Sequence, residues 1–124
     1  MTPADLLAAA RDLLERPALA SVGSWPRATA LLARQALEAA LDDFWKASPA
    51  TAGLARCTRK TQLTSLPAYL NPRLARDVGY LWHALSNACH YHPYDLAPTA
   101  AELSGWIDAV ATLQATIRDK RLAP

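Results

Sequence analysis

Apolar residues recur at intervals of three and four along most of this chain, a spacing that is typical of α-helices with one buried face. The pattern predicts four long helices separated by turn-forming residues. They run from Pro3 to the Arg16-Pro17 break, from Trp25 to about Lys46, from Pro72 to the His92-Pro93 pair, and from Thr99 through Ile117.

Residues that favour helix starts precede these segments. Thr2 and Asn71 are each followed by proline, and Ser24 stands before Trp25, so each is expected to cap the first turn. Thr99 with Glu102 has the spacing of a capping box, in which side chains and backbone N–H groups bond reciprocally. The last helix is therefore the most clearly delimited.

The segment from Leu54 to Leu70 follows a loop at residues 48–53 and has a weaker pattern. Pro67 is expected to end any helix that begins near Thr58, because proline cannot donate to the helical hydrogen-bond ladder. We expect a short helix and a turn here. The whole chain, residues 1–124, is thus predicted to be a single all-α domain, an up-and-down bundle of four main helices plus a short connecting helix.

One apolar stripe on each long helix supplies the predicted core. The stripes consist of Leu6, Leu7, Ala10, Leu13 and Leu14; of Ala30, Ala33, Leu37, Ala40, Leu41 and Phe44; of Leu74, Val78, Leu81, Leu85 and Cys89; and of Leu103, Trp106, Ile107, Val110, Leu113 and Ile117.

Composition supports the helical interpretation and narrows the functional classes. Hydrophobic residues make up 52% of the chain, and Ala and Leu supply most of them, which favours helices. Thirteen basic and eleven acidic residues give a formal charge of +2, so a nucleic-acid contact must be local. No apolar run approaches the roughly 20 residues of a membrane span, and no leader pattern is evident, so a cytoplasmic protein without membrane contact is expected. Cys57 and Cys89 are expected to be free and mostly buried.

A polar arc opposite the apolar stripe of the third long helix is the first candidate for function. At 100° per residue, Arg76, Tyr80, His83, Asn87 and His90 lie on one side, with Tyr80 expected at the edge of the core. An ordinary solvated face is one interpretation. A functional or oligomer surface is the other, because Tyr and His are poor choices for solubility compared with Lys and Glu.

The stretch Asn87-Ala-Cys-His-Tyr-His92 resembles a motif of the HEPN superfamily. These small helical bundles often dimerise and carry Arg, four to six arbitrary residues and His near the end of the third long helix. His92 matches the motif, whereas Asn87 stands where the motif has Arg. Arg76 and His83 also fit its loose spacing, but they lie earlier in the helix.

The resemblance implies a protein of an RNA-linked defence or toxin-type system, with metal-independent RNA cleavage or RNA binding as its activity. His92 or His90 is then expected to exchange a proton with the ribose 2′-hydroxyl or the leaving oxygen, and Arg76 or Arg34 to stabilise the phosphate charge. Asn87 can bind a phosphate or orient a histidine but cannot supply that charge.

Other chemistry is less well supported by the residues. Cys89, His90 and His92 point in different directions on a helix and lack an evident fourth ligand, so neither a metal nor another cofactor is expected. Cys89 falls on the apolar stripe, where a structural role is favoured. The cations Arg56, Arg59 and Lys60 can contact phosphates but are more often simply solvated, and Arg34 with Glu38 is expected to form an intrahelical pair.

Two assemblies follow from the polar arc. Tyr80 and Trp82 flank it, so burial of this helix against its copy in a homodimer would explain both aromatic residues. Alternatively, the protein is a non-enzymatic interaction module whose polar arc docks a partner protein, and Asn87 in place of arginine favours that alternative.

Overall fold

The computed structural model describes residues 2–16, 25–90 and 96–122, with side chains described as far as residue 119. Within these ranges the chain is helical and contains no strand, which confirms the all-α prediction. The elements are α1 (Pro3–Glu15), α2 (Trp25–Lys46), η2 (Ala52–Arg56), α3 (Arg59–Ser65), η3 (Leu66–Ala68), α4 (Pro72–Cys89) and α5 (Ala100–Leu122), where η marks a 3-10 helix.

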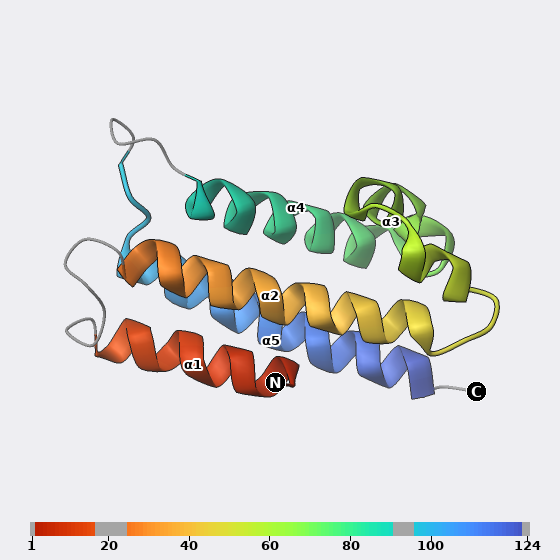
Figure 1. The fold of residues 1–124 in the computed structure, drawn as a ribbon, viewed down its shortest axis with the longest axis horizontal. Coiled ribbons are helices and arrows are strands. Elements are labelled where there is room, and N and C mark those ends of the chain that lie inside the picture. The colour runs from red at the N-terminus through yellow and green to blue at the C-terminus, as the bar shows by residue number, and fades with distance from the viewer. Residues whose placement is uncertain (1, 17–24, 91–95, 123–124) are drawn as a thin grey trace.

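The four long helices run alternately up and down, and α2 lies among the other three (Figure 1). It packs against α1, α4 and α5, whereas α4 rests mainly on α2 and less extensively on α5. The short elements η2, α3 and η3 lie beside the start of α4 (Figure 1). The predicted bundle of four main helices and a short connecting helix is therefore confirmed.

The predicted caps form where the structure describes them. The amide of Asp5 donates to Thr2 Oγ1 at 3.1 Å, and Asp5 accepts in return from the Thr2 amide at 3.0 Å. The backbone hydrogen bond from Thr2 lowers the pKa of the Asp5 carboxyl, and the Thr2 side chain adds to this effect. Thr99 and Glu102 form the predicted capping box with both bonds at 3.1 Å. Ser24 lies outside the described residues.

Small side chains on α2 bring its neighbours close. Ala30, Ala33 and Ala36 have no exposed surface, and Leu37 and Leu41 are equally buried between the surrounding helices. With little side-chain volume between the axes, dispersion contacts are made close to the backbone. The buried stripe of α5 likewise agrees with the prediction at Leu103, Ile107, Val110, Leu113 and Ile117.

The prediction is less accurate at the end of α2. Phe44 was expected in the core stripe, but it is only partly buried, and Trp45 is the fully buried residue of the pair. The ring of Trp45 meets that of Tyr69 edge to face at a centroid distance of 5.6 Å. Because Tyr69, the residue that follows η3, lies outside the four long helices, the stripe of α2 alone does not reveal which aromatic residue faces inward.

The weakly patterned segment folds as two 3-10 helices, one on each side of an α-helix of about two turns. Thr58 caps α3 through the Thr61 amide, and Pro67 lies in η3 directly after α3 ends, as predicted. Gln62 is buried, and its amide donates to the carbonyl of Leu54 at 2.8 Å, which ties α3 to η2. A hydrogen-bonded buried amide thus replaces part of the apolar contact that this segment lacks.

Among the helices described, none is both long and apolar enough to cross a membrane.

Two leucines of α2 provide a test of the packing. Leu37 is fully buried and Leu31 is 37% exposed, although both occupy the same helix. Leu37→Ala is expected to lower the free energy of unfolding by about 2–5 kcal/mol, since a buried cavity remains. Leu31→Ala is the matched control and is expected to change it by less than about 1 kcal/mol. Urea unfolding followed by circular dichroism measures both, and equal losses would contradict the placement of α2.

Candidate functional site

Helix α4 holds most of the candidate residues. It begins where the side chain of Asn71 accepts a hydrogen bond at 2.8 Å from the amide of Leu74, with Pro72 in the first turn. Its inner face is buried against α2 and α5, because apolar residues occupy that side throughout. They are Leu74, Ala75, Val78, Leu81, Leu85, Ala88 and Cys89.

The opposite face of α4 carries the predicted polar arc. Arg76, Tyr80, His83 and Asn87 are all exposed there. Tyr80 is 67% exposed, so the expectation that it lies at the edge of the core is wrong. The helix turns its side chain toward the solvent side, and neither α2 nor α5 reaches around to cover it.

The end of α4 differs from the prediction. The helix was expected to continue to the His92-Pro93 pair, but it ends at Cys89, and His90 is its C-cap with φ −123° and ψ 24°. The His90 amide donates to the carbonyl of Asn87 at 3.1 Å, a tightened last turn. Asn, Cys and His are weak helix formers, so the helix stops before proline requires it. His90 is exposed just beyond the helix, and His92 lies outside the described residues.

His83 is held by its neighbour on α4. The ring of Trp82 meets the His83 imidazole edge to face at a centroid distance of 5.3 Å and an interplanar angle of 80°. Trp82 is partly buried, and its indole Nε1 is buried without a hydrogen-bond partner in the described structure. The imidazole is therefore exposed for chemistry but rests against an anchored ring.

A hollow of about 720 Å³ opens between the end of α4 and the start of α5. Asn87 lines it from α4, His90 lines it from the residue that follows α4, and Trp106 and Glu102 line it from α5. The sequence assigned Trp106 to the core stripe, but it is only partly buried and contributes to this wall. The sequence could not show this role of Trp106. Its position in the apolar stripe gives the side of α5 on which it lies, but not how closely a neighbouring helix covers that side.

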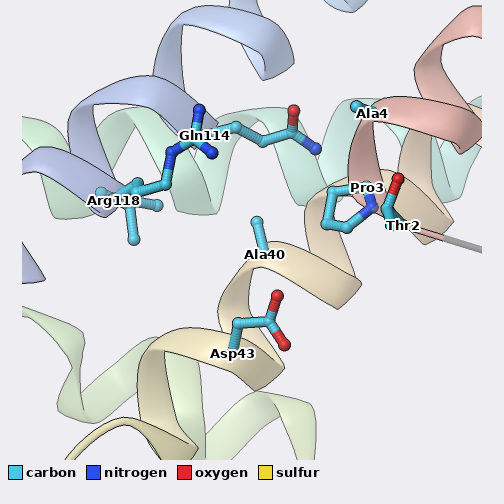
Figure 2. A pocket seen from close by; sticks show the side chains of 8 residues that line it. Thr2, Pro3, Ala4, Ala40, Asp43, Gln114 and Arg118 are labelled. Atoms are coloured by element: carbon cyan, nitrogen blue, oxygen red, sulfur yellow. The ribbon is translucent and has the colours of Figure 1, made fainter.

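A second, smaller hollow lies far from these residues, and none of the predicted site residues lines it. It measures about 360 Å³ and is surrounded by the start of α1 and the second halves of α2 and α5. Figure 2 shows Asp43, Gln114 and Arg118 around it, with Ala40 between them and Pro3 across from Arg118. Gln114 donates to the carbonyl of Ala36 at 3.3 Å, which is a structural contact between α5 and α2.

Four charged residues form a ladder between α2 and α3. Arg34 Nε lies 3.3 Å from Glu38 Oε1, the predicted intrahelical pair, although the two are not aligned as a hydrogen bond. Arg59 lies 3.3 Å from both Glu38 and Asp42 and donates to Gln62 at 2.6 Å. The expectation that Arg59 is simply solvated is therefore wrong, since it fastens α3 to α2.

The two cysteines have different surroundings. Cys57 is exposed, contrary to the prediction that both thiols are mostly buried, because the turn after η2 leaves it on the surface. Cys89 is buried against the core. Burial raises the pKa of the Cys89 thiol, Glu38 raises it further, and Arg34 and Arg27 oppose the shift.

Across the part of the chain that the structure describes, no three His, Cys, Asp or Glu residues gather as metal ligands. The structure thus aligns Arg76, His83 and Asn87 on one helical face and sets His90 just beyond it. Comparisons of the chain with protein families, curated proteins and solved structures found no match.

The cysteines allow a test of this end of α4. Near pH 8, iodoacetamide is expected to alkylate Cys57 at least ten times faster than Cys89, because the latter is buried and its raised pKa leaves less thiolate. The rate of Cys89 alkylation should rise with pH and level off only at a higher pH than the rate of an ordinary thiol does, because its pKa is raised. Peptide mass spectrometry gives both rates, and the unfolded chain in urea is the control in which the difference should vanish. Equal rates in the folded protein would place Cys89 outside the core.

Proposed function

We propose that this protein is a HEPN-like helical bundle that binds RNA through the outer face of α4 and acts in an RNA-linked defence or toxin-type system. The exposure of Arg76, His83 and Asn87 along one helical face is the observation that carries the proposal. Arginine supplies a permanent positive charge for a phosphate, and an amide and an imidazole supply hydrogen bonds to phosphate or ribose.

The spacing of these residues bears on catalysis. Arg76 and His83 are seven residues apart, which corresponds to about 10 Å along a helix axis. Two side chains that far apart are better placed to bind neighbouring nucleotides of an RNA strand than to act together on one scissile phosphate. Asn87 lies closer to His90 along the chain than Arg76 does, but it carries no charge, so no cation stands at that position. RNA binding is therefore the primary activity proposed, and metal-independent cleavage by His83, His90 or His92 is the secondary one.

A homodimer is part of the proposal. Tyr80 presents two-thirds of its surface to solvent in the middle of the polar arc, and large exposed aromatic residues are typical of interfaces. Two parallel copies of α4 that meet at Tyr80 about a two-fold axis along the helices bring the His83 and Asn87 side chains of both chains to one cleft. Such a cleft offers several donors to a phosphate that one helix alone cannot surround.

A partner-protein module is the second candidate. The amide at position 87, where the motif has arginine, favours it, as does the apolar exposure at Tyr80 and at Leu96, which is 96% exposed. In that case RNA has no specific affinity for the α4 face, and a protein partner covers it.

RNA assays with α4 variants distinguish these functions. Arg76→Gln and His83→Ala are each expected to weaken binding of single-stranded RNA at least about threefold, as loss of one phosphate or ribose contact implies. Arg16→Gln, an exposed cation at the end of α1, is the matched control. In EDTA, Asn87→Arg is expected to increase cleavage at least about tenfold, and adding His92→Ala should abolish that gain. Absence of RNA binding by the unaltered protein would refute this function and leave the partner-protein module.

Light scattering tests the assembly. The native protein is expected at twice the 13.4 kDa of one chain. Tyr80→Glu places two like charges opposite each other in the proposed interface and should give the single-chain mass with unchanged helicity. Thr112→Glu, on the exposed face of α5, is the control and should stay dimeric. A monomeric native protein, or a dimer indifferent to Tyr80→Glu, would rule out this interface.

A further inference from the structure

The small net charge of this chain hides a strong asymmetry. Residues 44–76 contain six cations and no acidic residue. The rest of the chain holds the other seven cations and all eleven acidic residues, which leaves it with a formal charge of −4. Separation of charge on this scale is what a local polyanion contact requires, even when the net charge is near zero.

The fold gathers this basic segment in one region. It comprises the end of α2, the short elements η2, α3 and η3, and the first turn of α4, all of which lie together beside the start of α4 (Figure 1). The outer face of α4, with His83 and Asn87, extends from the same region toward the other end of the bundle. A ligand bound at the basic segment is therefore in line with the polar arc.

Most of these cations are available to a ligand. Arg59 alone is neutralised, by Glu38 and Asp42. The ion pairs formed within the described ranges involve none of the remaining five, all of which are exposed. They are Lys46, Arg56, Lys60, Arg73 and Arg76.

An exposed aromatic residue lies in the same segment. Tyr69 is 46% exposed, and its ring is supported edge to face by the fully buried Trp45. Aromatic rings fixed among cations are a usual platform for unpaired bases, whereas an acidic protein segment needs only the charges. This combination favours a single-stranded nucleic acid over other polyanions.

We infer that residues 44–76 form a docking surface for single-stranded RNA, which holds the phosphate backbone at Arg56, Lys60 and Arg73 and directs the strand along α4 to His83 and Asn87. This inference rests on the proposed function, because it assigns the approach path for the same substrate. In this arrangement the basic segment attracts the RNA through its positive charge, and the polar arc binds it through hydrogen bonds.

The number of phosphate contacts predicts how strongly RNA binding depends on the salt concentration. Each phosphate neutralised on a single strand contributes about −0.7 to the slope of log K against log salt concentration. Four contacts, at Arg56, Lys60, Arg73 and Arg76, predict a slope of about −2.8, so affinity should fall roughly 50-fold between 50 and 200 mM KCl.

Fluorescence anisotropy with a labelled twelve-nucleotide oligouridine tests this. Arg56→Gln/Lys60→Gln is expected to reduce the slope by about 1.4 and to weaken binding at 50 mM KCl at least about tenfold. Arg16→Gln, which lies far from the segment, is the control. It should leave the slope unchanged and alter the affinity by no more than about twofold. Tyr69→Ala should weaken binding about fivefold or more, whereas Tyr69→Phe should retain it, since stacking needs the ring and not the hydroxyl. Melting curves confirm that each variant is folded.

The outcomes separate the two proposals. RNA binding that is lost with His83→Ala but unchanged by Arg56→Gln/Lys60→Gln overturns the docking surface and leaves the proposed function in place. Equal affinity for duplex DNA or heparin overturns the single-stranded RNA assignment in favour of a general polyanion site. No binding of the oligouridine at 50 mM KCl overturns both.

Discussion

Close approach of three helices to α2 is the constraint on which the rest of this structure depends. The fully buried alanines of α2 leave little volume between the axes, so α1, α4 and α5 share one core around it. Because α4 uses its apolar stripe for this contact, its polar face has to point outward. The exposure of the candidate site is therefore a consequence of core packing and does not depend on any interaction within the site itself.

A second layer of interactions places the basic segment. The connection between α2 and α4 is too short and too polar to build a core of its own, and it is fastened by the buried Gln62 and by Arg59. Arg59 satisfies two carboxylates of α2, which leaves the neighbouring cations without acidic partners among the described residues. The positive charge beside the start of α4 therefore comes from the other, exposed cations of the segment.

The two ends of α4 consequently differ in chemistry. Cations surround its first turn, whereas its last turns carry His83, Asn87 and Cys89, with His90 at the cap. The buried Cys89 has a raised pKa and packs as an apolar group, so reactivity at this end belongs to the exposed imidazoles. Helix α4 thus joins a region with exposed cations to a region with exposed imidazoles.

The sequence by itself determined the number and order of the four long helices, because apolar periodicity and the caps at Thr2, Asn71 and Thr99 are local signals. It also identified the outward face of α4, since 100° per residue fixes direction. It could not decide that Trp45 is buried instead of Phe44, that Cys57 is exposed or that Arg59 is neutralised by α2. Each of those outcomes depends on which segment packs alongside, and contacts between residues distant along the chain form only in the tertiary structure.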